Sequence, residues 1–357
     1  MAFSARRRGH EASESLLPWV VAALVATAVV VTALGAGPAR ANGAEQPTCS
    51  RTASIQYTAC RHEVRADFQV ARAICLNRAD EEERQECWEG AREERGDANS
   101  ECRAVREARW ELCDMLGEDP YDPDFDPALF DDDFDSPTNP NPYFPLDIGN
   151  VWVFEGDGET TRIEVLDKTK LVDGVRCIVV NDLVSDEDGR PIEDTDDWFG
   201  LRLNGDVDYC GESVRDFEFF EGDDPQEAEL IETAGSFKAG RSGDESGTLF
   251  PISPSEGDVF RQEWSASNAE DAAIVQSTTY RYPSGTELDE GVPRQLAELF
   301  CNEIPCVVLG EFSPMEPGVL ERKYFGAGIG KFLEVKVGED EVTRLVECNF
   351  DARCGDL

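Results

Sequence analysis

The sequence predicts an α+β protein of two modules. The first is an N-terminal disulfide-stapled antiparallel helical hairpin, and the second is an all-β antiparallel domain forming a curved sheet or partly closed barrel. Three observations predict this. Six cysteines between Cys49 and Cys113 have palindromic spacing. Residues 52–116 are rich in Ala, Glu and Arg and contain no proline. From Phe144 onward, short β-branched and aromatic runs alternate with turn signals.

The N-terminal segment has the order of a secretory signal. Arginines at positions 6–8 precede an apolar run over residues 16–34, and Ala39-Arg40-Ala41 supplies a small-residue cleavage site. We therefore expect a signal peptide over residues 1–41 and a secreted or periplasmic mature protein. The alternative is an uncleaved N-terminal transmembrane helix, because an apolar run of 19 residues is long enough to span a bilayer.

The cysteine spacing predicts how the hairpin, residues 48–117, is stapled. Successive cysteines are 11, 15, 12, 15 and 11 residues apart, so pairs taken from the outside inward all sum to 162. A constant sum indicates two antiparallel helices folded about a turn near residue 81. The expected disulfides are Cys49–Cys113, Cys60–Cys102 and Cys75–Cys87. A metal site is the competing interpretation, but these gaps are far longer than zinc-ligand spacing.

The helices are expected from about Thr52 to Leu76 and from about Arg84 to Leu116. The 162 rule places small residues such as Ala71 and Ala91 opposite one another, which suits the short Cα separation of a disulfide. A break or kink at Gly96–Asn99 is the alternative for the second helix, and it would allow a different pairing.

Residues 118–143 are expected to form an acidic Pro/Asp linker. The candidate calcium ligands are Asp122, Asp124, Asp126 and Asp133, because their spacing is similar to the ligand spacing of a calcium loop. Pro127 stands where that loop needs glycine, so a solvated, extended linker is the favoured interpretation. Calcium is the one cofactor that the sequence suggests.

Residues 144–357 are expected to form one antiparallel all-β domain without long helices. Turn signals such as Asp173-Gly174 and Asn204-Gly205 separate the strand-like runs. Gly326–Gly330 lies between two such runs, so we expect a bend and not a phosphate loop. The remaining cysteines are expected to close as Cys301–Cys306, Cys348–Cys354 and, by elimination, Cys177–Cys210.

One acidic strand is the candidate ligand-binding site. Asp194, Asp196, Asp197 and Trp198 combine carboxylates with an aromatic ring, as a glycosidase or sugar site does. In an extended strand Asp197 shares a face with Glu193, and the other three residues lie on the opposite face. A solvated hairpin is the competing interpretation. A second polar cluster, residues 261–264 with 270–271, predicts an ordinary cross-strand salt bridge.

The net charge and the histidine content exclude some classes of binding partner, catalytic site and metal site. The chain has 33 basic and 75 acidic residues, a net charge of −42. Such a surface excludes nucleic acid and leaves cations, an extracytoplasmic protein or a glycan as partners. Once the signal is removed, His62 is the only histidine. A Ser–His–Asp triad in the β domain and a multi-histidine zinc site are therefore excluded.

Several sequence blocks carry a family resemblance. The blocks NPYFPLDIGNVWVFEG, EDTDDWF, GSFKAGRSGDESG, GDVFRQEWSASNAED and KYFGAGIGKFLEV occur in this order. Together they resemble a family of uncharacterised secreted bacterial proteins. The resemblance spans about residues 100–346 and implies a domain that works outside the cytoplasm, without implying catalytic residues.

These observations predict an exported, non-catalytic binding or cell-envelope structural protein. The alternative is a carboxylate-dependent, glycosidase-like hydrolase that uses the region Asp194–Trp198.

Overall fold

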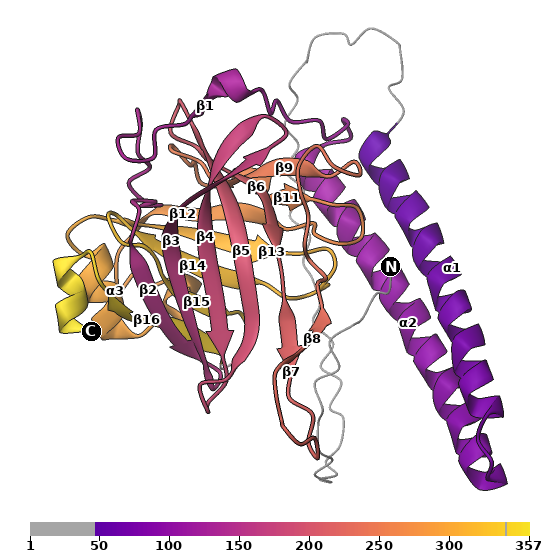
Figure 1. Ribbon diagram of the computed structural model, residues 1–357. Helices are drawn as coiled ribbons and strands as arrows, with labels where there is room; N and C mark the ends of the chain where they lie inside the picture. The colour runs from indigo at the N-terminus through magenta and orange to yellow at the C-terminus, as the bar shows by residue number, and fades with distance from the viewer. Residues whose placement is uncertain (1–46, 340) are drawn as a thin grey trace, which may run out of the picture. The chain divides into compact units, whose positions relative to one another are not determined.

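A computed structural model describes residues 47–339 and 341–357, and it has the two predicted modules (Figure 1). The expected signal segment, residues 1–41, lies outside the described residues. Helix α1 (Thr48–Leu76) and helix α2 (Glu81–Leu116) form the hairpin, and the rest of the described chain is dominated by a sixteen-stranded antiparallel sheet. In the part of the chain that the structure describes, no helix is long and apolar enough to cross a membrane.

The three hairpin disulfides have the pairing that the spacing predicts. Their Cα–Cα distances are 5.7, 6.0 and 5.4 Å for Cys49–Cys113, Cys60–Cys102 and Cys75–Cys87. Asp80 caps α2, because its Oδ1 accepts hydrogen bonds from the amides of Glu82 and Glu83. The alternative of a break near Gly96 is wrong. A glycine costs a helix only about 1 kcal/mol, and disulfides on either side hold α2 in place.

The connector after the hairpin is not the solvated linker that its composition suggests. Phe130 and Asp131 form the short strand β1 (Phe130–Asp131), which pairs with β5, and Phe130 and Phe134 are buried. A short 3-10 helix, η1 (Pro127–Leu129), precedes this strand. The buried aromatic residues anchor the connector on the sheet, while most of its aspartates face solvent. The high Pro and Asp content therefore suggested a solvated linker although two aromatic residues bind it to the sheet.

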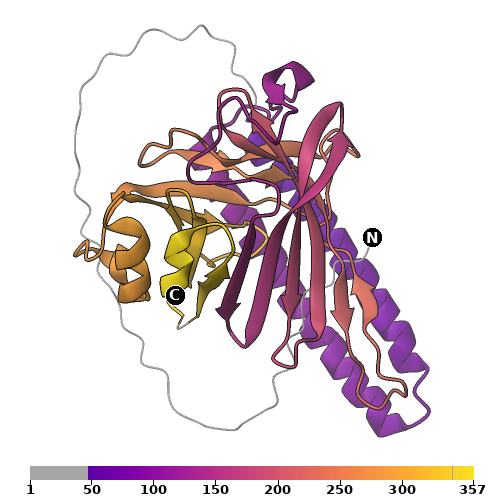
Figure 2. The same ribbon diagram turned by 60° about the vertical axis from the view of Figure 1, so that its left-hand side comes forward.

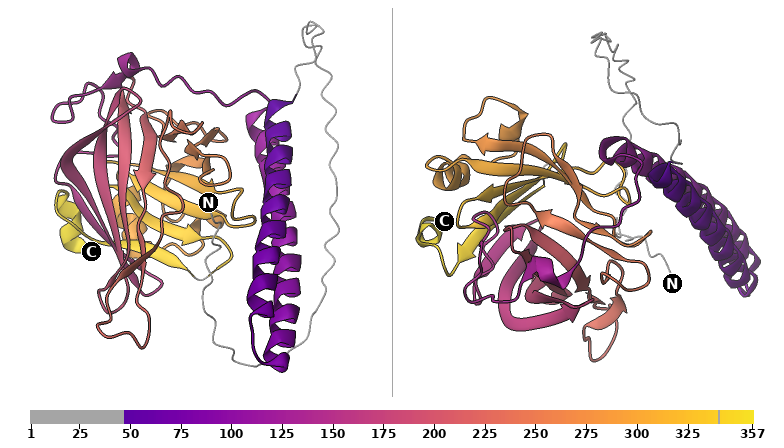
Figure 3. Two further views of the ribbon diagram at one scale, coloured as in Figure 1. Left: turned by 45° about the vertical axis from the view of Figure 1, so that its right-hand side comes forward. Right: turned by 90° about the horizontal axis from the view of Figure 1, so that it is seen from above.

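Four long strands form one wall of the sheet: β2 (Val151–Gly156), β3 (Glu159–Val172), β4 (Val175–Ser185) and β5 (Pro191–Arg202). The chain continues through β6 (Val207–Ser213), β7 (Asp216–Glu218), β8 (Glu229–Glu232), β9 (Glu245–Phe250), β10 (Val259–Arg261) and β11 (Glu263–Trp264). The other wall contains β12 (Ala272–Tyr280), β13 (Cys306–Phe312), β14 (Glu321–Gly326), β15 (Gly330–Lys336) and β16 (Val342–Cys348). Figure 2 shows the curvature of the first wall, and the view from above in Figure 3 shows both walls.

One short segment brings the two edges of the sheet together. Strand β10 pairs with β12, strand β11 pairs with β9, and only Gln262 separates β10 from β11. The Gln262 amide donates a hydrogen bond to Asp271 O, and its side chain donates to Leu249 O. The sheet is therefore nearly closed, and strands that are far apart in the hydrogen-bonding order face one another across its interior.

Aromatic rings fill part of this interior. Phe250 on β9 lies 4.7 Å from Phe325 on β14, measured between ring centroids, although these strands are not neighbours. Phe144, from the segment before β2, contacts Phe199 at 5.6 Å and Phe325 at 6.5 Å. These contacts make the faces that carry Phe199, Phe250 and Phe325 the inner face of the sheet.

The β domain also contains short helices that the sequence did not predict. An eight-residue helix, α3 (Arg294–Cys301), buries Leu296, Ala297 and Phe300, and short 3-10 helices occur at η2 (Glu287–Asp289) and η3 (Ala352–Asp356). The helix is only two turns long, too short for its period to stand out in the sequence. The bend expected at Gly326–Gly330 is present between β14 and β15, where Gly328 and Gly330 have φ angles of 79° and 77°.

All twelve cysteines form disulfides, including Cys177–Cys210, Cys301–Cys306 and Cys348–Cys354. Disulfides persist in oxidising compartments and are rare in the cytosol. The cysteine content therefore indicates an extracytoplasmic location.

Candidate functional site

On several strands, a charged residue lies two positions from a buried apolar residue on the inner face of the sheet. On β4 buried Val180 is followed by Asp182, and on β5 Phe199 is preceded by Asp197. The same step occurs at Leu309–Glu311 on β13, Phe325–Lys323 on β14 and Ala273–Asp271 at the start of β12. Residues two apart in a strand share a face. The interior therefore has an apolar part and a charged part.

Lysines neutralise one side of the charged part. The Lys323 ammonium lies 2.6 Å from Glu311, 3.6 Å from Glu321 and 3.7 Å from Glu334. Burial opposes the charge of Lys323, but these carboxylates raise its pKa well above the ordinary value. Burial likewise opposes the charge of Glu334, but Lys331, 3.1 Å away, and Lys323 hold the pKa of Glu334 at about 2. This side is a compact network of paired charges.

The other side, which we call the acidic interior, carries several carboxylates close to one another. Tyr209 links two of them, because its hydroxyl donates a short hydrogen bond to Asp197 Oδ1 and lies 3.1 Å from Glu212 Oε2. The acidic interior consists of Asp182, Glu193, Asp197, Glu212, Glu263 and Asp271, contributed by β4, β5, β6, β11 and the start of β12.

The pKa values show that these carboxylates resist ionisation. Burial raises the pKa of Asp182 to about 7; Lys331 opposes this rise, and Glu193 adds to it. Burial and the charge of Asp182 raise the pKa of Asp197 to about 7. The pKa values of Glu212 and Glu263 are raised well above the ordinary value, mainly by burial and then by neighbouring carboxylates. A cation among these groups would favour their ionised forms.

Asp182 is the least satisfied member of the acidic interior. Its Oδ1 is buried and has no hydrogen-bond partner among the described residues. A buried acceptor without a partner costs about 1–3 kcal/mol. Asp182 as a whole residue is half-buried.

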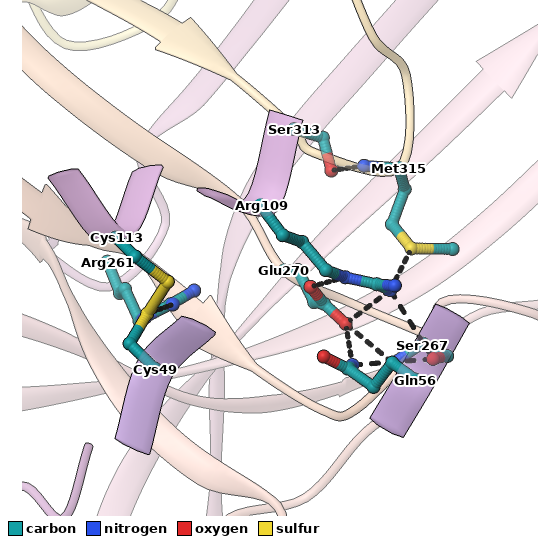
Figure 4. A network of polar contacts seen from close by, with 9 residues as sticks. All are labelled: Cys49, Gln56, Arg109, Cys113, Arg261, Ser267, Glu270, Ser313 and Met315. Carbon is teal, nitrogen blue, oxygen red and sulfur yellow. Dashed lines mark hydrogen bonds and ion pairs between the residues drawn. A yellow bond between two sulfur atoms is a disulfide. The ribbon is translucent and has the colours of Figure 1, made fainter. Parts of the chain in front are cut away.

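The hairpin fixes the loop that enters the acidic interior. Glu270 Oε1 accepts hydrogen bonds from Gln56 Nε2 at 2.6 Å, Arg109 Nη2 at 2.8 Å and the Ser267 amide at 2.6 Å (Figure 4). Arg109 Nε lies 2.7 Å from Glu270 Oε2, and both side chains are buried. The sequence suggested a cross-strand partner for Glu270, whereas the partner is an arginine of α2. The next residue, Asp271, belongs to the acidic interior.

The structure divides the predicted ligand-binding residues between the two faces of β5. Asp197 lies in the acidic interior. On the outer face, Asn181 Nδ2 donates hydrogen bonds to Asp194 at 2.8 Å and to Asp196 at 3.3 Å, and Trp198 lies under the ammonium of Lys170 at 5.1 Å. The predicted alternation of faces is correct. The four residues do not form one site.

Two of the four candidate calcium ligands of the connector, Asp126 and Asp133, stabilise local turns. Asp126 Oδ1 accepts a hydrogen bond from the Ala128 amide, and Asp133 Oδ1 accepts from the amides of Asp135 and Ser136. Asp122, Asp124, Asp126 and Asp133 are all exposed. Across residues 47–339 and 341–357, no three His, Cys, Asp or Glu side chains are placed to share a metal ion.

Sequence reasoning missed Asp182, Tyr209 and Glu212. The signal that marks them is a polar residue at an inward position, two residues from a buried apolar one. That signal cannot be distinguished from a solvated strand end until the curvature of the sheet is known.

Comparisons with known proteins give only weak likenesses. No protein-family model matches the chain, and no curated protein matches it significantly. The chain is similar to a "putative lipoprotein" from Parabacteroides distasonis, with 12% identity, a TM-score of 0.30, 59% of this chain covered and 100% of the other. It is also similar to a "putative exported protein with YmcC-like fold" from Bacteroides fragilis, with 13% identity, a TM-score of 0.27 and coverages of 58% and 98%.

Proposed function

We propose that this is an extracytoplasmic binding protein whose acidic interior receives an organic cation bearing several amino groups. The observation that carries the proposal is the buried, unpartnered Oδ1 of Asp182 among carboxylates from five parts of the sheet. An ammonium group would donate the missing hydrogen bond to Asp182 and offset the repulsion between Asp182 and Asp197.

The spread of the carboxylates favours an oligoamine over a metal ion. Calcium needs six to eight oxygen ligands about 2.3–2.6 Å from one centre, and the described residues bring no such group together. A flexible amine can place separate ammonium groups against separate carboxylates. Tyr209, between Asp197 and Glu212, adds an aromatic ring, which attracts cations.

Calorimetric titration with spermidine tests this proposal. We expect spermidine to bind the intact protein saturably at neutral pH. This binding should persist when sodium replaces the other buffer ions at the same ionic strength. Asp182→Asn/Asp197→Asn should weaken the binding at least about a hundredfold, because two charge-assisted hydrogen bonds of roughly 1.5–3 kcal/mol each are lost.

A matched variant controls for net charge. Asp167 and Glu227 are exposed and lie outside the acidic interior, so Asp167→Asn/Glu227→Gln should leave spermidine binding unchanged. Equal weakening by both double variants would reduce the interaction to general charge attraction and contradict the proposal. Tighter saturable binding of calcium than of spermidine would contradict it as well and would favour the calcium site suggested by the sequence.

A further inference from the structure

One side of the helical hairpin carries arginines stacked on aromatic rings. The guanidinium of Arg106 on α2 lies 4.3 Å from the ring centroid of Tyr57 on α1 and 4.5 Å from that of Trp110. Two further contacts follow towards the hairpin turn, Arg95 on Phe68 at 4.6 Å and Arg72 on Trp88 at 5.5 Å. Each of the three sets joins α1 to α2, so the two helices present these residues on the same side.

Helical spacing extends this side, which we call the basic flank. Residues 57, 61, 65, 68 and 72 recur at steps of three and four, and such residues share a helix face. The basic flank contains Arg61, Arg65, Arg72, Arg92, Arg95, Arg103 and Arg106, and all except Arg106 are exposed. Gln56 and Arg109 contact Glu270 and are buried, whereas six of the seven arginines of the basic flank are exposed. The basic flank is therefore open to solvent.

The arginines of the basic flank have few acidic partners. The one ion pair that the described residues place there joins Arg106 to Glu107 at 3.6 Å. Arg106 Nε is buried and has no hydrogen-bond partner. Residues 48–117 contain 11 arginines and 15 acidic residues, so the basic flank is a local feature of an acidic hairpin. The stacked rings hold the guanidinium groups of Arg72, Arg95 and Arg106 in place. Arg72 Nη1 donates to Gln69 and Arg103 Nη2 donates to Ser100, and each of these two exposed groups has further donors.

We infer that the basic flank binds a linear anionic polysaccharide of the polyuronate type. A row of guanidinium groups matches a row of carboxylates, because each guanidinium can donate two parallel hydrogen bonds to one carboxylate. From Tyr57 to Arg72 the row is roughly 22 Å long at about 1.5 Å per residue, which is the reach of several sugars. Guanidinium groups stack on Tyr57, Phe68 and Trp88, which are half-buried, and Trp110 is the one exposed ring among these residues. This side therefore lacks the continuous apolar face that an interfacial membrane helix inserts.

Binding to size-fractionated polygalacturonate tests the inference with the intact protein. We expect saturable binding that weakens with salt, since screening reduces exposed charge interactions, and no binding to the fully methyl-esterified polymer. Arg65→Gln/Arg72→Gln/Arg92→Gln/Arg95→Gln should weaken binding at least about tenfold. Glutamine and arginine have similar helix propensities, so unchanged helical circular dichroism would confirm that the variant is folded.

A variant with the same loss of charge outside the hairpin provides the control. Arg176, Arg241, Arg281 and Arg294 are exposed in the β domain, and replacing all four by glutamine should change the affinity less than about twofold. Three results would overturn the inference: no saturable binding by the wild type, equal weakening by both variants, or tighter binding to phosphatidylglycerol vesicles or single-stranded DNA than to polygalacturonate. Spermidine binding does not depend on this flank, so the two proposals can fail separately.

Discussion

Replacing Arg109 by methionine is expected to destabilise the protein by about 3–5 kcal/mol, the typical cost of leaving a buried charge without its partner. Arg109 supplies both nitrogens that neutralise Glu270, and the two side chains are 6% and 2% exposed. In the variant, only Gln56 and the Ser267 amide would still donate to the Glu270 carboxylate. Chemical denaturation measures the free energy of unfolding, and hydrogen exchange shows whether the hairpin leaves the sheet.

A second substitution separates loss of charge from loss of packing. In Arg109→Met/Glu270→Gln, the amide oxygen can still accept from Gln56 and Ser267, and no charge is buried. We expect this double variant to recover more than half of the lost stability. If Arg109→Met costs less than about 1 kcal/mol, as exposed ion pairs do, the pair does not hold the hairpin to the sheet.

The second large effect is a fall in stability as the pH rises from about 5.5 to 8. Asp182 and Asp197 have pKa values of about 7 in the folded protein, against about 3.9 for an unperturbed aspartate. Between these values the folded state binds more protons than the unfolded state, so the free energy of unfolding decreases with pH. One pKa unit corresponds to about 1.4 kcal/mol, so Asp182 contributes roughly 4 kcal/mol between its unfolded and folded pKa values, of which roughly 2 kcal/mol falls between pH 5.5 and 8.

Denaturant midpoints measured across this pH range check the prediction. The wild type should be more stable at pH 5.5 than at pH 8. Asp182→Asn/Asp197→Asn should reduce this difference, while Glu212 and Glu263, whose pKa values are also raised, continue to contribute to it. The pKa of Glu334 is about 2, so the stability that its ion pair contributes is lost only below about pH 4.5. This loss does not affect the stability change measured between pH 5.5 and 8. A flat wild-type profile, or a double variant that keeps the slope, would contradict the proposed burial of these groups.

The hairpin was predictable in detail because the regular spacing of its cysteines and the periodicity of its helices can both be read directly from the sequence. The cysteine spacing identifies the partners Cys49–Cys113, Cys60–Cys102 and Cys75–Cys87 without knowledge of any other contact. Strands such as β2 and β4 were also recognisable, because β-branched residues and glycine turns mark them in the sequence.

The acidic interior was not predictable, because it depends on which strands face one another. Asp182 and Lys331 influence each other electrostatically, yet they are distant in sequence and lie on strands separated in the sheet order by β16, β2 and β3. Nothing local distinguishes Asp197, which is inside, from Asp196, which is outside, apart from alternation along β5. Even that alternation does not reveal which face is enclosed.

A crystal structure of the wild-type protein grown with spermidine at pH 8 tests the central claim most directly. The proposed function predicts electron density for the amine in the acidic interior, with one nitrogen within about 3 Å of Asp182 Oδ1 and a second near Asp197 or Glu212. An interior that holds only water, with spermidine bound instead to Asp194 and Asp196 on the outer face, would contradict it.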